Sequence, residues 1–205
     1  MKEPNLVTSK KILDFFSRIG LRYLDRSRVV SERFEAYSWA NSPYAQANRV
    51  EFEELSRLYA EDLKKSKRAE VFLAFISDQV GWGVFAQKDL PAGTLVGEYT
   101  GIIREAQDCE PVRDDKGHFL SDYAWNYPDE LPDGTEFEID ARDEGNELRF
   151  VNHSFEPNVG VDHTLVDGIF VTFFKALTNI PAGTQLLIDY GEEYWSGGFR
   201  TLELL

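Results

Sequence analysis

Cysteine and long apolar runs are almost absent from this sequence. Cys109 is the only cysteine among 205 residues, which excludes an internal disulfide framework and a zinc site built from cysteines of this chain. Because no basic residue lies beside it, we interpret Cys109 as an ordinary reduced thiol. No apolar run approaches the roughly 20 residues that span a bilayer, and residues 1–11 lack the pattern of a secretory signal. We therefore expect a soluble protein that does not act at a membrane.

Histidine is scarce as well. The chain has three histidines, His118, His153 and His163, and their spacing does not form a convincing set of metal ligands. A lone histidine in a β-rich region is more often a hydrogen-bonded structural residue than a ligand. We therefore expect no metal site.

The net charge of −14 is unevenly distributed along the chain. Residues 1–70 carry 14 Lys and Arg against 11 Asp and Glu, whereas the remaining residues carry 8 against 25. An acidic surface repels a phosphate backbone and attracts basic peptides, so we expect a basic protein partner and no direct binding of nucleic acid. Charge alone is equally well explained by an acidic surface that only keeps the protein in solution.

The first 70 residues show helical periodicity. After Thr8 or Ser9, apolar residues recur every three or four positions as far as Gly20, and the same spacing returns from Val50 to Arg68. Ser42-Pro43 lies between these two runs and suggests a break in the helical structure. We therefore predict an α-helical extension over residues 1–70.

From Val71 onward, short apolar or alternating runs are separated by Gly, Pro and Asp, which is typical of strands and turns. The predicted strands cover Val71–Ser77, Gly83–Ala86, Leu95–Tyr99, Phe137–Asp140, Ile169–Phe174 and Leu186–Tyr190. The fold class is therefore mainly β, with the helical extension preceding it.

One segment of the β region occurs twice. Leu90–Thr94 and Ile180–Thr184 share the pattern apolar-Pro-Ala-Gly-Thr, which we interpret as a type I turn with Pro second and Gly fourth. The strand-like run after each turn ends in a tyrosine, at Tyr99 and Tyr190. We therefore expect these two tyrosines at comparable strand ends.

Three short motifs carry polar or glycine-rich chemistry, and each is weak when taken alone. Gly81-Trp82-Gly83 permits close approach of the backbone to a ligand, but a tight turn without a ligand fits it equally well. The run from Arg149 to Ser154 places Asn152 and His153 in an otherwise apolar region. Tyr190 before Gly191 could simply end a strand.

Together and in this order, the motifs resemble those of SET-domain protein lysine methyltransferases. The similarity covers about residues 71–195 and leaves residues 196–205 as a C-terminal tail. The segments that carry it are Gly81–Ala86, Gly97–Gly101, Ile139–Arg142, Arg149–Asn158 and Asp189–Trp195. The resemblance implies a SET-domain (β-clip-like) fold of short sheets with a pseudoknot. It also implies that S-adenosylmethionine (AdoMet) binds on one face, while a substrate lysine enters by a narrow channel from the other.

The resemblance assigns roles to individual residues. Tyr190 and Tyr99 match the tyrosines that line the methyl-transfer site and are the expected catalytic residues. Ile188 and Trp195 are expected in the substrate channel. The residues that match cofactor contacts are Gly81, Trp82, Gly83, Tyr123, Arg149, Asn152, His153 and Tyr194.

The implied reaction is direct methyl transfer from AdoMet to a deprotonated lysine amine, and it requires no metal. Because the ordinary pKa of tyrosine is near 10, Tyr190 is expected to position the amine rather than to remove its proton. The position two residues before this tyrosine often holds Phe or Tyr in the family, and it tunes the number of methyl groups added. Here it is Ile188, which predicts capacity beyond monomethylation. The acidic SET segment favours a histone tail or another basic protein as substrate.

The chain departs from many family members in one respect. It lacks the cysteine clusters that bind zinc before the SET domain and after the catalytic tyrosine. The channel wall must then come from elsewhere, and a homodimer is one source. A catalytically weak SET fold that acts as a protein-binding module stays open as the alternative function, and a structural β protein with accidental motifs is a third. The short form resembles stand-alone bacterial and viral SET proteins, so the compartment could be the cytoplasm or, for a bacterial effector, a host nucleus.

Overall fold

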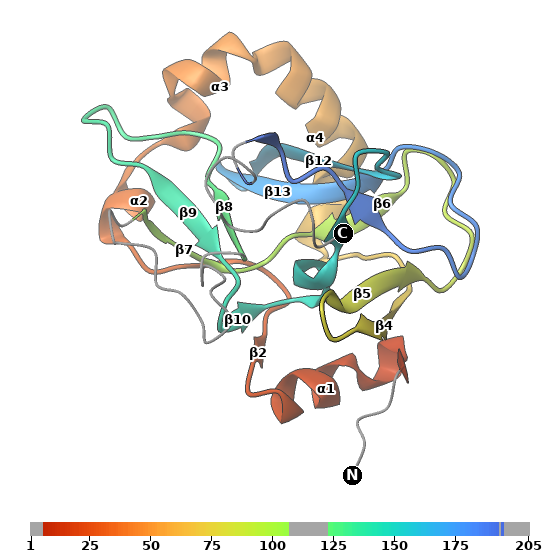
Figure 1. The fold of residues 1–205 in the computed structure, drawn as a ribbon. Coiled ribbons are helices and arrows are strands. Elements are labelled where there is room, and N and C mark those ends of the chain that lie inside the picture. Colours follow the sequence, from red (N-terminus) through yellow and green to blue (C-terminus); the bar gives the residue numbers. More distant parts are fainter. Residues whose placement is uncertain (1–5, 107–122, 193, 195–205) are drawn as a thin grey trace.

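The computed structural model describes residues 6–106, 123–192 and 194, and Figure 1 shows their arrangement. Short strands, gathered in several small sheets, form the centre of the molecule, which confirms the mainly β fold class. Among the described residues, all helices except one 3-10 helix lie in the first 70 residues. The helices are η1 (Ser9–Lys11), α1 (Ile12–Arg18), α2 (Glu32–Ala36), η2 (Trp39–Asn41), α3 (Pro43–Ala47), α4 (Arg49–Lys64) and η3 (Glu147–Phe150).

The predicted break at Ser42-Pro43 is the start of α3. The Ser42 hydroxyl accepts a hydrogen bond of 3.0 Å from the backbone N–H of Ala45, and Pro43 occupies the first helical position. A serine cap followed by proline is a strong helix start, because proline lacks the N–H that would otherwise have no partner there. The same two residues that break the chain between α1 and α4 therefore begin a new helix.

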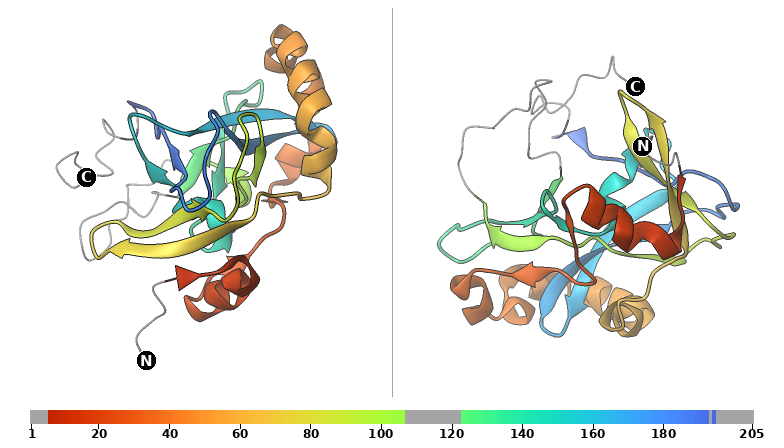
Figure 2. Two further views of the ribbon diagram at one scale, coloured as in Figure 1. Left: turned by 90° about the vertical axis from the view of Figure 1, so that its right-hand side faces the viewer. Right: turned by 90° about the horizontal axis from the view of Figure 1, so that it is seen from below.

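Helix α4 covers one face of the molecule. It buries Phe52, Leu55 and Leu63 at helical spacing. Its Ser56 hydroxyl lies 2.8 Å from the Thr164 hydroxyl, which ties the helix to β12 (Val159–Val166). Helix α1 lies at the opposite end of the molecule from α3 and α4 (Figures 1 and 2). The β region is therefore braced by helices at two ends.

The first 70 residues also contribute strands. These are β1 (Leu6–Val7), β2 (Arg22–Tyr23) and β3 (Arg28–Val29). Each pairs with a strand from the later part of the chain, β1 with β4, β2 with β10 and β3 with β7. The change from helical to strand-like sequence near residue 70 is therefore not a separation in space.

The sheets bring together strands that are distant in sequence. Their orders are β1-β4-β5, β12-β13-β6, β3-β7-β9-β8, β10-β2 and β11-β14. The strands not yet bounded are β4 (Val71–Ser77), β5 (Gly81–Ala86), β6 (Leu95–Glu98), β7 (Ile102–Glu105), β8 (Ala124–Asn126), β9 (Phe137–Asp140), β10 (Glu144–Gly145), β11 (Asn152–His153), β13 (Ile169–Ala176) and β14 (Leu187–Ile188).

The two repeated turns lie side by side and support each other. Leu90 and Ile180 exchange both backbone hydrogen bonds, each of 2.8 Å. The Asn179 side chain accepts from the backbone N–H of Ala92 in the first turn, and Asp89 accepts from Ala182 in the second. The sequence echo is therefore a structural pair with reciprocal caps.

The interpretation of these turns as type I is wrong. The closing bonds run from Thr94 N–H to the Pro91 carbonyl and from Thr184 to Pro181, each of 3.1 Å, so Gly is third in the turn rather than fourth. Gly93 and Gly183 have φ of +81° and +83°. A positive φ at the third position is the geometry of a type II turn, which explains why glycine stands there.

Candidate active site

The segments that carry the central and terminal motifs lie against each other. Strands β11 and β14 pair in parallel, with Asn152 opposite Leu187 and His153 opposite Ile188. The Tyr190 backbone N–H donates to Nδ1 of His153 over 3.1 Å. The Tyr190 phenol donates to the carbonyl of Val151 over 2.8 Å. The structure therefore brings Asn152, His153 and Tyr190 together, as the sequence predicts.

His153 is held as a neutral imidazole. Its Nδ1 accepts the Tyr190 N–H, so this nitrogen carries no proton. Burial lowers the pKa of His153 from its ordinary value, although the carboxylate of Asp189, 3.6 Å from Nδ1, opposes this effect. The residue thus sets the backbone position of Tyr190, which is a structural role at the edge of the site.

A hollow beside this junction contains most of the expected cofactor residues. It encloses about 500 Å³ of space, partly open to solvent. The expected residues Gly81, Trp82, Tyr123, Arg149, Asn152 and Tyr194 line it, together with Val80, Phe150 and Tyr190. The size is in the range of small-molecule sites. We refer to this space as the cofactor hollow.

Asn152 joins the two sides of the cofactor hollow. Its Nδ2 donates to the carbonyl of Trp82 over 3.1 Å, which fixes the turn at the start of β5. Gly81 has a φ of +80° and open space where a Cβ would be, so the turn leaves the hollow unobstructed there.

Two of the expected cofactor residues, Gly83 and His153, are not among the described residues that line the hollow. Gly83 is required for packing, because a Cβ there would approach Cδ1 of Ile76 to 2.7 Å and Nε2 of Gln185 to 2.9 Å. Its lack of a side chain lets β5 lie close to these neighbours. Both residues therefore support the hollow from behind.

A second space begins on the other side of Tyr190. It encloses about 420 Å³ and is lined by Tyr99, Ile188, Tyr190 and Tyr194, as well as by Ala124, Trp125, Leu148, Arg149 and Val151. Ile188 therefore lies where the sequence predicts a substrate channel. Trp195, the other expected channel residue, lies outside the described residues. We refer to this space as the channel.

Sequence reasoning missed several lining residues. Trp125 and Ala124 directly follow Tyr123, so their proximity to a motif residue was a usable signal. Val151 lies between Arg149 and Asn152, but its contribution is structural, since its carbonyl accepts from Tyr190. Leu148 carried no signal, because a buried leucine in a short helix is ordinary.

Arg149, Tyr190 and Tyr194 line both spaces, so the cofactor hollow and the channel meet at these side chains. Tyr99 is fully buried nearby, and its phenol donates to the Tyr123 carbonyl over 2.8 Å. Burial raises the pKa of Tyr99 above its ordinary value, so the phenol is neutral. The two spaces are therefore separated by uncharged phenols and one guanidinium.

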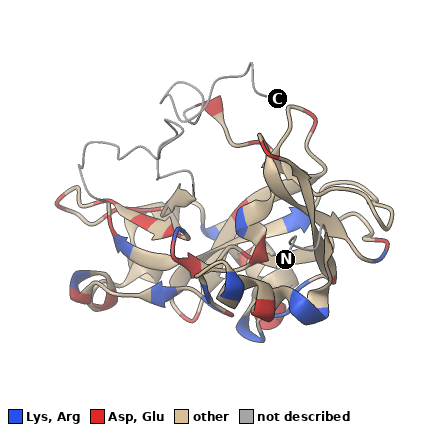
Figure 3. Cartoon of the chain, turned by 60° about the horizontal axis from the view of Figure 1, so that its bottom comes forward, with Lys and Arg blue, Asp and Glu red and all other residues tan. Residues whose placement is uncertain are grey.

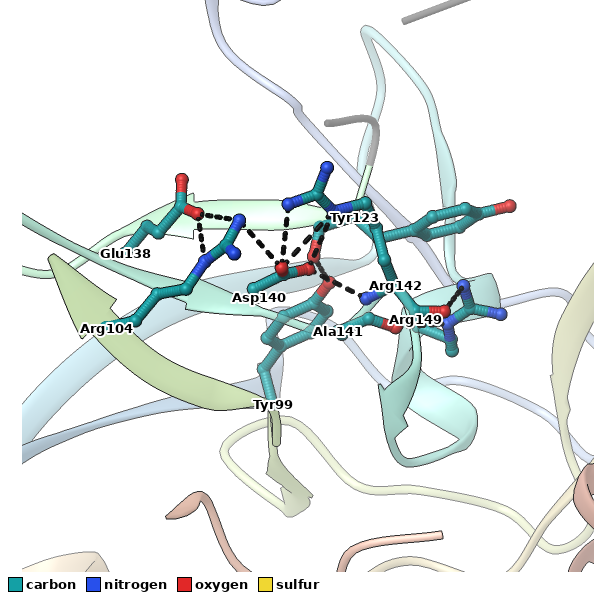
Figure 4. A network of polar contacts seen from close by, with 8 residues as sticks. All are labelled: Tyr99, Arg104, Tyr123, Glu138, Asp140, Ala141, Arg142 and Arg149. Atoms are coloured by element: carbon teal, nitrogen blue, oxygen red, sulfur yellow. Dashed lines mark hydrogen bonds and ion pairs between the residues drawn. The ribbon is translucent and has the colours of Figure 1, made fainter. Parts of the chain in front are cut away.

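A polar network fixes Arg149 and the strands behind it (Figure 4). The Arg149 Nε donates to the Ala141 carbonyl over 2.8 Å, and Nη2 donates to the Arg142 carbonyl over 3.2 Å. The Arg142 guanidinium in turn pairs with Asp140 at 2.8 Å, and Arg104 approaches the same carboxylate to 3.0 Å. Hydrogen bonding and charge from Arg142 and Arg104 outweigh burial and lower the pKa of Asp140.

Comparison with known proteins identifies the family. A sequence model of the SET domain matches residues 81–191, more than half of the chain. The chain belongs to the SET domain family. The match begins at the glycine turn of the cofactor hollow and ends one residue after Tyr190.

Curated relatives of this SET-domain chain are histone-lysine N-methyltransferases. The mouse (Mus musculus) protein EHMT1 is 36% identical over 124 residues, which cover 58% of this chain and 9% of the relative. MEDEA of Arabidopsis thaliana is 36% identical over 129 residues, which cover 60% of this chain and 17% of the relative. The chain thus spans less than a fifth of the length of these two relatives.

Solved structures confirm the SET-domain fold. The structure of ATXR5 in complex with histone H3.1 mono-methylated on R26 aligns with a TM-score of 0.59 at 17% identity, over 91% of this chain and 93% of that one. Residues 71–205 could not supply so large a share of this chain, so the alignment includes part of the N-terminal helices and strands.

Neither a membrane span nor a metal cluster is found in the part of the chain that the structure describes. No helix there is long and apolar enough to cross a membrane. Nor do three His, Cys, Asp or Glu side chains gather there as a metal ion would require.

Proposed function

We propose that this chain is an AdoMet-dependent protein lysine N-methyltransferase that acts on a histone or a similar basic protein. The observation that carries the proposal is the meeting of two spaces at Tyr190. A methyl donor in the cofactor hollow and an amine in the channel would face each other there without either crossing the protein surface.

The cofactor hollow fits AdoMet by the chemistry of its lining. AdoMet combines an adenine ring, a ribose and a charged methionine moiety. Aromatic rings of Trp82, Tyr123 and Tyr194 offer faces for the adenine, and the amide of Asn152 offers polar contacts. When bound, AdoMet supplies a methyl group activated by its attachment to a sulfonium.

The channel fits an unbranched side chain with an amine at its tip. The amine attacks the methyl carbon with its lone pair, and the new N–C bond forms as the C–S bond breaks and leaves its electron pair on sulfur. The proton of the ammonium departs to water before this step. Tyr99 and Tyr190 direct the amine along the line of attack, and such alignment supplies a large share of the acceleration.

Carboxylates beside the site support a basic substrate. Glu156 follows β11, while Asp189 and Glu192 flank Tyr190, and all three are exposed. In Figure 3 the upper part of the ribbon, nearest to the C-terminus mark, carries acidic colour and no basic colour. Such a field attracts Lys- and Arg-rich tails and raises their rate of encounter. The names of the curated relatives agree with a histone as that substrate.

The deciding experiment is incubation of the chain with AdoMet and a panel of histones and basic peptides, followed by mass spectrometry. We expect mass additions of whole methyl groups on lysine. A chain that binds AdoMet by calorimetry but adds no methyl group to any panel member would instead be a binding module. A chain that neither binds AdoMet nor transfers a methyl group would contradict the proposal entirely.

A further inference from the structure

Arg149 is a buried cation without an acidic partner. It is 9% exposed, and its polar contacts are the two hydrogen bonds to the carbonyls of Ala141 and Arg142. Its guanidinium carbon lies 3.8 Å from the centre of the Tyr123 ring and 4.9 Å from that of Phe150. No carboxylate pairs with it among the described residues. Carbonyl dipoles and ring faces hold the charge in place without cancelling it.

The position of this charge is unusual. Arg149 lines both the cofactor hollow and the channel. No Asp or Glu occurs among the described residues that line either space, so the guanidinium field extends into both. Burial lowers the pKa of Arg149, which shows the cost of keeping the charge there, but a guanidinium stays charged at physiological pH.

A substrate amine must lose a proton before it can accept a methyl group. With a lysine pKa of about 10.4, only about one amine in 2,500 is neutral at pH 7. A unit charge within about 10 Å, at the effective dielectric typical of proteins, shifts a pKa by roughly one unit. A nearby cation shifts it downward, because it disfavours the ammonium.

We propose that the Arg149 guanidinium keeps the acceptor lysine neutral in the channel, by adding a fixed positive charge to that of the sulfonium. This inference rests on the proposed function and deepens it. Exposed carboxylates outside the site draw the ammonium toward the channel, and the cationic interior removes its proton to water. Arg149 thereby does the work that a general base performs elsewhere, without accepting a proton.

The charged and titratable groups around Arg149 are consistent with this role. Tyr99, Tyr123, Tyr190 and Tyr194 contribute phenols and no carboxylate. The nearest acidic groups that act on Arg149 are Asp143 and Asp140. Asp140 is engaged by Arg142 and Arg104, and Asp143 does not line either space. The acidic groups therefore lie behind the guanidinium, on the side away from the channel.

The first test measures the lysine pKa directly in the wild-type chain. S-adenosylhomocysteine has a neutral thioether in place of the sulfonium, so in its complex only the protein can lower the pKa. A peptide of the histone H3 N-terminal tail with ¹³C-labelled lysines is titrated by NMR in that complex. We expect the bound lysine to titrate about one unit below the same lysine in the free peptide. An unshifted bound lysine would overturn the inference, and this measurement needs no variant.

The second test compares Arg149→Gln with Arg149→Lys. The glutamine keeps a donor for the Ala141 carbonyl but removes the charge, whereas the lysine keeps the charge. We expect the acid limb of kcat/KM against pH to move up by about one unit in Arg149→Gln, with roughly a tenfold loss at neutral pH that is recovered at high pH. Arg149→Lys should keep the wild-type limb.

A peptide with S-aminoethylcysteine in place of the target lysine sharpens the comparison, because its amine has a lower intrinsic pKa. It should restore most of the neutral-pH activity of Arg149→Gln. Equal losses at every pH and with both peptides would overturn the inference, as would a fall in AdoMet affinity large enough to explain the loss. If wild-type chain transfers no methyl group at any pH, the proposed function itself fails, and that result is distinguishable from a wild-type enzyme whose lysine pKa is unshifted.

Discussion

The phenol of Tyr190 donates a hydrogen bond of 2.8 Å to the carbonyl oxygen of Val151, one residue before Asn152. This bond crosses from the terminal motif to the central motif and fixes the ring between the cofactor hollow and the channel. A phenol that donates in this way is neutral, so it orients its surroundings rather than removing protons. Its removal should therefore affect methyl transfer more than cofactor binding.

We expect Tyr190→Phe to lower kcat at least a hundredfold while AdoMet affinity changes by less than about threefold. The lost group aligns the reacting atoms, and misalignment of this kind is costly. Tyr59→Phe is the matched control, because Tyr59 on α4 donates to the Gly93 carbonyl and lines neither space. Single-turnover assays and calorimetry give the two quantities. Full activity in Tyr190→Phe would refute the assigned role.

Asn152→Ala should weaken AdoMet binding about tenfold, because the bond from Asn152 to the Trp82 carbonyl holds the glycine turn against β11. Equilibrium binding by calorimetry measures the change. Asn41→Ala removes an exposed amide bonded to Ser38, far along the chain from either motif, and should leave AdoMet affinity unchanged. Equal effects in the two variants would show that Asn152 has no specific role.

Arg68→Met should destabilise the fold by about 3 kcal/mol. The Arg68 side chain is 15% exposed and approaches the Glu147 carboxylate, itself 5% exposed, to 3.7 Å. Removing one partner of a buried pair leaves the other charge uncompensated. Lys67→Met is the neighbouring control, since Lys67 is 63% exposed and its pair with Asp62 should contribute less than about 1 kcal/mol. Urea unfolding of both variants tests the difference.

Stability should fall as the pH is lowered below about 6.5. Burial lowers the pKa of both His153 and His163 in the folded chain, so the unfolded chain binds protons first as the pH falls. Stability from these residues is therefore fully present above the unfolded value and is lost as the pH falls through the folded values. Urea midpoints measured across this range should decline, and the decline should be smaller in His163→Gln. A midpoint that rises on acidification would contradict the assignment.

The wild-type chain should add more than one methyl group to its target lysine. Ile188 is buried, lines the channel and has no hydroxyl to restrain the amine. Ile188→Tyr narrows the channel and should limit the product to monomethyllysine, as read by mass spectrometry with excess AdoMet. A wild-type enzyme that stops at one methyl group, with no change in Ile188→Tyr, would exclude this role.

The sequence predicts those elements whose pattern is long enough to be distinctive. Val71–Ser77 and Phe137–Asp140 are strands at the predicted bounds, because alternating apolar residues between turn residues have few other structures available. Strands β1, β2 and β3 escape prediction because two residues contain no period. They form only when a distant strand offers a partner, which is tertiary information.

Strand β12 was overlooked although a signal was present. Asp167-Gly168 separates two apolar runs, and both residues have positive φ, at 52° and 89°. This dipeptide favours the tight turn of a hairpin. For the site, motif residues such as Asn152 and Tyr190 were predictable from order and spacing. Gly83 was assigned to the cofactor hollow but supports it from behind, since a sequence cannot show which way a glycine faces.

The reciprocal caps of the twin turns have a consequence for how the chain acquires its structure. Asp89 waits for Ala182, and Ala92 waits for Asn179, so neither turn is complete until some 90 residues between them have been synthesised. Contacts of such large sequence separation slow folding, since chain entropy is lost before the contact is made. Fragments that stop short of Thr184 should emerge with an unfinished first turn, and the two halves will be won or lost in a single cooperative event.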